Sequence, residues 1–140
     1  MTKPRWEHFA HQADIGVRGI GATRDEAFQQ AALALTAVIT DPRKIVAREP
    51  LEVNCEADDE EMLFVDWLNR LIYEISTRKM LFSRFDIWVH PPTLRARIWG
   101  EPISPTRHRP AVEVKAATYH ELIVRQTEDG LWIAQCVVDV

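Results

Sequence analysis

The sequence is poor in cysteine, in glycine and in long apolar runs. Its 140 residues contain two cysteines, Cys55 and Cys136, and they form no CxxC pair. No stretch approaches the roughly 18 apolar residues that span a bilayer, and residues 1–8 lack the apolar core of a signal peptide. We therefore expect a cytoplasmic protein with no membrane partner, whose two thiols are reduced and buried.

An excess of positive charge is missing as well. The chain has 17 Lys and Arg against 21 Asp and Glu, a formal net charge of −4. A protein that clamps the phosphate backbone over a broad surface carries the opposite sign. The hydrophobic fraction of 46% argues against disorder, and the length suits one domain. The composition therefore indicates a single compact domain whose function depends on a small local site.

Two segments have helical periodicity. The first follows Thr23, which forms a capping box with Glu26, and ends at Asp41-Pro42, because proline pushes the residue before it out of the helical region. The second starts near Asp58, which the acidic sequence predicts as the N-cap, and fades near Lys79.

Most of the remaining chain alternates between apolar and polar residues, which is typical of half-buried strands. The strands are predicted over residues 51–57, 85–89, 94–98, 112–116, 122–124 and 131–138. Residues 90–93 predict a hairpin, residues 128–130 a turn, and residues 102–110 a loop. The order along the chain is two strands, a helix, a strand, a helix and then several strands, which predicts an α+β fold with two helices packed on a mainly antiparallel or mixed β-sheet.

Two local motifs suggest ligands without completing a known pattern. The Gly19-Ile20-Gly21 segment precedes a helix, but a dinucleotide fingerprint needs a small residue where Arg24 stands, and no Walker sequence is present. Turn glycines explain the same residues. His8 and His11 form an HxxH pair, but no further ligand lies at a standard zinc spacing. Polar residues at the end of a strand explain this pair equally well.

The end of the chain places acids beside an apolar strand. The Asp139 side chain and the Val140 terminus would lie within a few ångströms of each other, and such hard oxygen ligands suit Ca²⁺, Mg²⁺ or Mn²⁺ better than zinc. An ordinary solvated terminus is the alternative. Asp14 is either a turn residue or a directed ligand. Lys115 is either a surface lysine or the positive group that faces these acids.

Taken together, the motifs have a recognisable order along the whole chain. They are Trp6-Glu7-His8, His11-x-Ala13-Asp14-Ile15-Gly16, Trp67-Leu68-Asn69, Gly100-Glu101, Lys115-Ala116-Ala117-Thr118-Tyr119-His120, Trp132-x-Ala134-Gln135 and Asp139-Val140. In this combination the chain resembles the archease family, which implies a single archease-like domain over residues 1–140. A departure is Gln12, which stands where many members have threonine, at a position that is not an expected ligand.

The resemblance implies a role that composition could not give. Archeases are accessory proteins of the RtcB-type RNA ligase, which joins tRNA halves after intron removal. They promote the metal- and GTP-dependent guanylylation of the ligase and its multiple turnover, and they are not enzymes themselves. The partner expected here is therefore an RtcB-type ligase, with tRNA reached indirectly through it.

The resemblance also implies the site residues. The family binds a divalent cation, often calcium, through residues that match Asp14, Asp139 and Val140. Mg²⁺ or Mn²⁺ are the alternatives to Ca²⁺. The other functional residue of the family matches Lys115, so Asp14 and Lys115 are expected to be critical for activation.

Two other functions compete with this hypothesis. The same acids could serve a stand-alone metal-dependent phosphoester hydrolase, which would need an open metal position and a substrate pocket. The chain could also be an RNA-binding or chaperone-like module with a local patch of Arg95, Arg97, Arg107 and Arg109. Steep salt-dependent affinity for tRNA would favour the second alternative.

Overall fold

The structure is a computed structural model that describes residues 3–140, so residues 1 and 2 of the expected domain lie outside the described residues. The strands are β1 (Arg5–His11), β2 (Asp14–Gly21), β3 (Glu49–Glu56), β4 (Met80–His90), β5 (Thr93–Pro102), β6 (Ala116–Ala117), β7 (Ile123–Gln126) and β8 (Trp132–Asp139). The helices are α1 (Arg24–Ile39), α2 (Glu60–Arg78) and the short α3 (Pro105–His108), with a 3₁₀ turn, η1 (Pro42–Lys44). None of the helices in the described part of the chain is long and apolar enough to cross a membrane.

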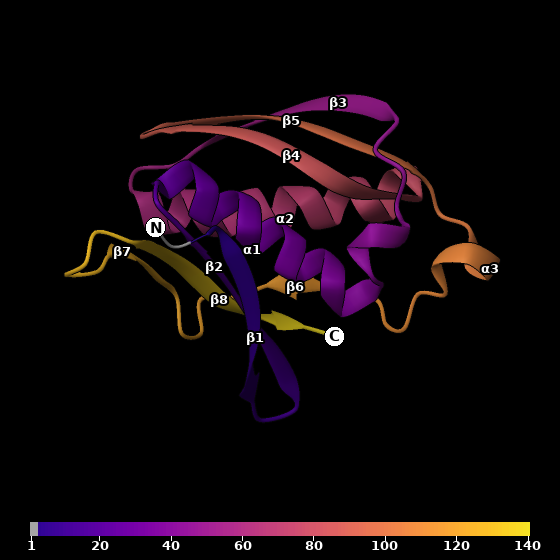
Figure 1. The fold of residues 1–140 in the computed structure, drawn as a ribbon, viewed down its shortest axis with the longest axis horizontal. Coiled ribbons are helices and arrows are strands. Elements are labelled where there is room, and N and C mark those ends of the chain that lie inside the picture. The colour runs from indigo at the N-terminus through magenta and orange to yellow at the C-terminus, as the bar shows by residue number, and fades with distance from the viewer. Residues whose placement is uncertain (1–2) are drawn as a thin grey trace.

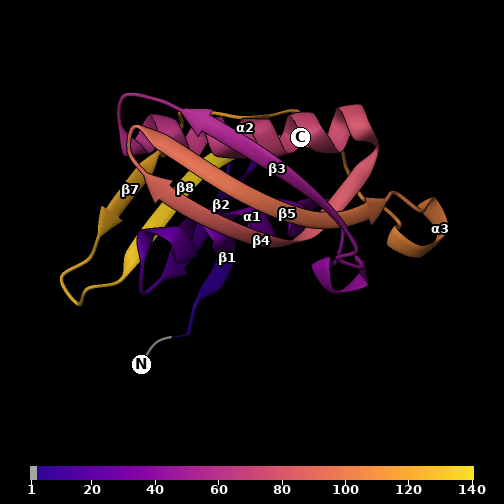
Figure 2. The same ribbon diagram turned by 90° about the horizontal axis from the view of Figure 1, so that it is seen from above.

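The strands form two antiparallel sheets with α1 and α2 between them (Figure 1). One sheet has the order β1-β2-β8-β6, with β7 also paired to β8, and the other has the order β3-β5-β4. Figure 2 looks onto the second sheet, whose strands cross the helices that lie behind them. The α+β class and the packing of two helices on antiparallel strands are confirmed, and the structure adds the division into two sheets.

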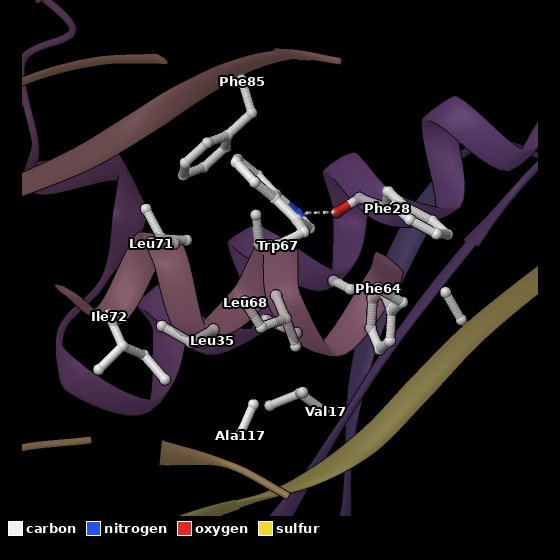
Figure 3. Close-up of a cluster of buried hydrophobic side chains, with 14 of the residues drawn as sticks. Val17, Phe28, Leu35, Phe64, Trp67, Leu68, Leu71, Ile72, Phe85 and Ala117 are labelled. Atoms are coloured by element: carbon white, nitrogen blue, oxygen red, sulfur yellow. Dashed lines mark hydrogen bonds between the residues drawn. The ribbon is translucent and has the colours of Figure 1, made fainter. Parts of the chain in front are cut away.

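The core lies in the helical layer, where aromatic side chains of α1, α2 and β4 pack together, and Val17 and Ala117 of the other sheet lie nearby (Figure 3). Trp67 of α2 is fully buried, and its Nε1–H donates a hydrogen bond of 3.2 Å to the carbonyl of Phe28 in α1. Its ring meets Phe85 of β4 edge-on at 6.1 Å between centroids. Phe28 packs against Phe64 at 5.0 Å. These contacts hold the two helices to each other and to β4.

Both helices begin at side-chain caps, although one cap differs from the prediction. At α1 the Thr23 hydroxyl accepts the Glu26 N–H at 3.1 Å, as predicted, and the Glu26 carboxylate accepts the Ala22 N–H at 2.8 Å. At α2 the N-cap is Asp59, whose carboxylate accepts the Met62 N–H at 2.8 Å. The prediction of Asp58 was wrong by one residue, because both neighbours are aspartates and sequence spacing alone does not separate them.

The glycines that precede α1 lie inside β2, so the interpretation as turn glycines was wrong. A Cβ atom at Gly19 would lie 1.9 Å from the carbonyl oxygen of Ala27, and one at Gly21 would lie 2.4 Å from Cβ of Glu26. The absence of side chains therefore lets α1 pack directly against the strand. These contacts explain the two glycines without a nucleotide.

The C-terminal half contains two further differences from the sequence prediction. The strand expected over residues 112–116 is reduced to the two residues of β6, Ala116 and Ala117. The expected loop over residues 102–110 contains α3. The hairpin at residues 90–93 and the turn at residues 128–130 are confirmed, since they join β4 to β5 and β7 to β8.

Candidate functional site

One end of β8 brings together the sequence positions that were expected to form a site. β2 pairs with β8 so that Ile15 lies opposite Val138, and β6 pairs with β8 so that Ala116 lies opposite Asp139. Continuing the first register by one residue places Asp14 opposite Asp139. We call this end of the sheet, with Asp14, Asp139 and Val140, the acidic tip.

The two aspartates share a face of the sheet because directly opposed residues point to the same side. The neighbouring Ile15 and Val138 pack into the core between sheet and helices. By the alternation of side chains along a strand, Asp14 and Asp139 project from the outer face. Both are half-buried. The fold therefore directs two carboxylates toward solvent from adjacent strands.

Val140 and Lys115 lie beside these aspartates in different ways. The Val140 side chain packs against the core, which holds this last residue in place. The Lys115 N–H donates a hydrogen bond of 2.8 Å to the Asp139 carbonyl, so its backbone is fixed at the tip. Its side chain lines a shallow hollow with Tyr73 and Thr77 of α2. Within residues 3–140 the Lys115 ammonium forms no ion pair with a side-chain carboxylate.

Asn69 of α2 holds β6 in place, a role that the sequence pattern did not predict. Its side-chain amide donates to the Ala117 carbonyl at 3.1 Å, and its carbonyl oxygen accepts the Ala117 N–H at 2.8 Å. The amide thus imitates a neighbouring strand and pairs β6 with a helix. The Trp67-Leu68-Asn69 motif was the available signal, but its partner lies 48 positions away in the chain.

The histidines of the HxxH pair are separated by the structure. His8 Nε2 donates a hydrogen bond of 2.7 Å to the carbonyl oxygen of Ala34, which ties β1 to α1. The His11 ring lies 5.7 Å from the ring of His120, and its Nδ1 is buried without a hydrogen-bond partner among residues 3–140. The structure therefore gives no support to an HxxH zinc site.

The acidic tip has the donor chemistry of a hard-cation site. In the described part of the chain, no group of three or more His, Cys, Asp or Glu side chains is arranged to hold a metal ion. The two aspartates alone do not make such a group, and the third ligand that the family resemblance implies is Val140. Such an all-oxygen set fits Ca²⁺, Mg²⁺ or Mn²⁺, which favour carboxylate ligands.

Comparison with known proteins identifies the family of the whole chain. The model of the archease protein family matches residues 6–140, which include all but the first residue of β1, the acidic tip and Val140. The chain belongs to the archease family. The archease of Pyrococcus furiosus is 39% identical over 140 residues, covering 97% of this chain and 99% of that protein. The archease of Sulfurisphaera tokodaii is 36% identical over 138 residues, with the same coverage of 97% and 99%.

Solved structures share the archease fold with this chain. The solution structure of protein 1598 of Methanobacterium thermoautotrophicum superposes with a TM-score of 0.78 and 31% identity, covering 96% of this chain and 98% of that one. The crystal structure of a Thermotoga maritima archease, described as a possible chaperone, has a TM-score of 0.65 and 24% identity, covering 100% and 98%. The second likeness shows the fold alone.

This member of the archease family also has a buried carboxylate cluster, which the sequence reading missed. Glu101 is fully buried and receives two hydrogen bonds from Arg107, at 2.6 and 2.8 Å. Arg48 and the Val46 N–H donate at 2.9 and 2.8 Å. His108 Nδ1 accepts the Ser104 N–H at 2.8 Å, so the ring proton is on Nε2, which donates to Glu101 at 2.9 Å. This saturation indicates a structural role, which ties α3 and the chain before β3 to β5.

The electrostatics of this cluster agree with that role. The hydrogen bonds from Arg107, opposed by burial and aided by those of Val46, His108 and Arg48, hold the pKa of Glu101 well below its ordinary value of 4.5. Arg107 is therefore committed to Glu101, so it is not a free cation for the arginine patch that the RNA-binding alternative considered. The Gly100-Glu101 motif was the only signal for this cluster.

The two cysteines are free thiols, as expected. Burial raises the pKa of Cys136 to about 12 and that of Cys55 to about 11. Because the thiolate is the reactive form, these groups are poor nucleophiles and poor metal ligands at neutral pH. Cys136 is buried and Cys55 only half-buried, so the prediction of two buried thiols is confirmed for the first alone.

Proposed function

We propose that this chain activates an RtcB-type RNA ligase by promoting its metal- and GTP-dependent guanylylation and its multiple turnover, in tRNA splicing or RNA repair. Membership of the archease family supports an accessory role. The observation that carries the proposal is the convergence of Asp14, Asp139 and Val140 at one end of the sheet, from opposite ends of the sequence.

The acidic tip is proposed to hold one divalent cation, most suitably Ca²⁺. Asp14 and Asp139 would supply side-chain carboxylates and Val140 the terminal carboxylate, a set of hard oxygen ligands. When bound, the cation would neutralise negative charge near phosphate groups, which is where phosphoryl transfer gains most of its catalysis. The two aspartates face solvent together, so they are accessible to a large partner such as a ligase.

Lys115 is proposed to contribute a positive point charge next to the tip. The β6–β8 register, continued by one residue, places it opposite Val140. The Asn69 clamp on Ala117 fixes the backbone of this segment, while the ammonium remains on an exposed and flexible stem. Such an ammonium is suited to meet a phosphate of GTP or of the guanylylated ligase.

A guanylylation assay with the purified ligase, GTP and Mn²⁺ tests this function. We expect the wild-type chain to raise the yield of guanylylated ligase and the number of turnovers, and Asp14→Ala and Lys115→Ala to abolish this stimulation. Asp58→Ala and Lys44→Ala are matched controls, because both residues are exposed and far along the chain from the tip. Full stimulation by both tip variants would overturn the site assignment.

An assay of the purified chain without the ligase distinguishes a ligase activator from a stand-alone enzyme. The chain alone, incubated with Mn²⁺ and a panel of phosphoesters, is expected to show no turnover. Turnover that depends on Asp14 would instead establish the alternative of a stand-alone hydrolase. Calorimetric titration with Ca²⁺ is expected to show one site in the wild-type chain and none in Asp14→Asn.

A further inference from the structure

The outer face of the β3-β5-β4 sheet displays aromatic and cationic side chains together. Figure 2 looks onto this face, which lies on the other side of the helical layer from the acidic tip. Alternate residues of β4 and β5 are buried against the helices, so their neighbours face solvent. The solvent-facing set comprises Trp88, Trp99, Arg84, Arg95 and Arg97. Trp88 is 49% exposed, a high fraction for so large an apolar side chain.

The guanidinium groups on this face stack over the indole rings. Arg84 lies 4.2 Å from the Trp99 ring centroid, and Arg97 lies 6.0 Å from the same ring. Arg95 lies 5.8 Å from the centroid of Trp88. Stacking holds a guanidinium by its face and leaves its N–H edge free to donate to an anion. The face therefore combines flat apolar surface with ordered donors.

Two of the three arginines are already neutralised, and one is not. Arg97 pairs with Glu52 at 2.6 Å, and Arg84 contacts Asp86 at 3.4 Å. The Arg95 side chain forms no ion pair or hydrogen bond with any residue in the described range 3–140, although its backbone pairs within the sheet. The guanidinium carbon of Arg95 lies 5.8 Å from the ring centroid of Trp88, so the half-exposed indole and a guanidinium whose N–H groups have no partner among residues 3–140 are neighbours.

A hollow of about 480 Å³ connects these groups. Its lining also includes Asn54, Glu52 and Asp86. A protein hot spot is a desolvated apolar pocket, whereas this hollow is bordered by polar groups that can meet the edge of a base or a sugar hydroxyl. Carboxylate and amide oxygens accept hydrogen bonds from the 2′-hydroxyl group, which DNA lacks.

We propose that this face, the Trp88–Arg95 platform, binds a short single-stranded RNA segment. A base stacks on the indole of Trp88, and the adjacent phosphate meets the guanidinium of Arg95. Aromatic side chains on an open sheet are a recurring way to bind single strands, because every base has a π-face. The neighbouring acids, Glu52 and Asp86, limit the contact to a few nucleotides, consistent with the net charge of −4. The proposal is independent of the metal site and of the ligase.

Fluorescence anisotropy with the full chain tests the platform. The probe is a fluorescein-labelled oligouridylate of about ten nucleotides, a length within the range that single-strand sites cover. We expect Trp88→Ala to weaken binding roughly 5- to 150-fold, the range of a single base–aromatic stack. Arg95→Ala is expected to weaken binding and to reduce the slope of log K against log salt by about 0.7, as for one phosphate contact to a single strand.

Two matched control variants lie outside the β3-β5-β4 sheet. Tyr73→Ala removes another exposed aromatic, 59% exposed on α2, and Arg125→Ala removes an exposed arginine of β7. Both are expected to bind as the wild type does. Circular dichroism melting of all four variants verifies that they are folded, which is expected because every replaced side chain is at the surface.

Three results would overturn the proposal. The first is absence of wild-type binding at about 50 mM salt, where phosphate contacts are strongest. The second is equal or tighter binding of a DNA oligomer or an RNA duplex, since neither fits a platform that reads unpaired RNA. The third is that RNA does not bind, while Trp88→Ala prevents co-elution of the chain with the ligase. That result would show that this face binds a protein instead.

Discussion

Individual carboxylates have two contrasting environments in this molecule. Glu101 is fully buried and has hydrogen bonds from three charged or polar side chains and a backbone amide. Asp14 and Asp139 are left half-buried at the end of a sheet, and neither has an ion-pair partner among residues 3–140. A carboxylate with all its partners stabilises a fold, whereas unpartnered carboxylates that lie close together are free to take a cation.

The Glu101 cluster predicts a pH-dependent stability. Because the folded pKa of Glu101 lies below its ordinary value of 4.5, its contribution is present above that pH and is lost as the pH falls further. At pH 7 we expect Glu101→Gln to lower the free energy of unfolding by about 2–3 kcal/mol, since it leaves donors unpaired around a buried site. The difference from wild type is expected to shrink as the pH falls below 4.5.

Urea denaturation from pH 7 to pH 2.5 measures this prediction. Glu52→Gln is the control, because Glu52 forms an exposed pair with Arg97 and its removal should cost less than about 1 kcal/mol. A constant difference between wild type and Glu101→Gln at all pH values would show that the charge of Glu101 does not stabilise the fold.

The sequence could indicate some of these residues and not others. Asp139 and Val140 follow an apolar strand, so alternation and position alone predicted that their carboxylates would lie together. Glu101 appeared only within the Gly100-Glu101 motif, and its burial could not be predicted, because it depends on Arg48 and Arg107, which reach it from separate segments of the chain. The convergence of Asp14 with Asp139 likewise required strand pairing between the two ends of the chain.

At the scale of elements, length and periodicity were sufficient for the long helices and strands. The two long helices and the β4–β5 hairpin appear where their patterns predict them. The strand β6 could not be predicted in this way, because two residues are too few to show an alternation of apolar and polar side chains. It is held by the Asn69 side chain rather than by a strand propensity of its own. Short elements of this kind depend on tertiary contacts that local sequence does not encode.

The N-cap of α2 gives a direct test at this scale. Asp59→Ala removes the acceptor of the Met62 N–H and is expected to lower the free energy of unfolding by about 1 kcal/mol. Asp58→Ala is the matched control, because Asp58 is an exposed neighbour outside the helix and should change stability by less than about 0.5 kcal/mol. Urea denaturation of both variants measures the difference. A larger loss of stability in Asp58→Ala than in Asp59→Ala would show that Asp58 is the N-cap.

At the scale of the whole molecule, the division of the strands into two sheets could not be predicted from the sequence. Alternation shows that a strand has one buried face, but it does not say which strands are neighbours. Here the N-terminal hairpin pairs with the last strand, so β2 and β8 join the two ends of the chain. This pairing separates the acidic tip from the Trp88–Arg95 platform by a layer of helices, and it gives the chain two independent surfaces.

The same pairing makes the two ends of the chain unequal in their tolerance of added residues. Val140 lies at the acidic tip, whereas Arg5 begins β1 at the end of the hairpin that is remote from Asp14. The seven residues of β1 span about 20 Å. A peptide appended after Val140 would convert the terminal carboxylate into an amide, whereas one placed before β1 would leave every proposed ligand in place.

We therefore expect a C-terminal hexahistidine extension to weaken Ca²⁺ binding about 10- to 100-fold, because a site with one fewer carboxylate loses both charge and a ligand. An N-terminal extension of the same sequence is the control and should leave the affinity unchanged. Calorimetric titration of the two tagged chains and the untagged chain compares them directly. If the C-terminal extension binds Ca²⁺ as tightly as the untagged chain, Val140 is not a ligand and the site consists of the two aspartates alone.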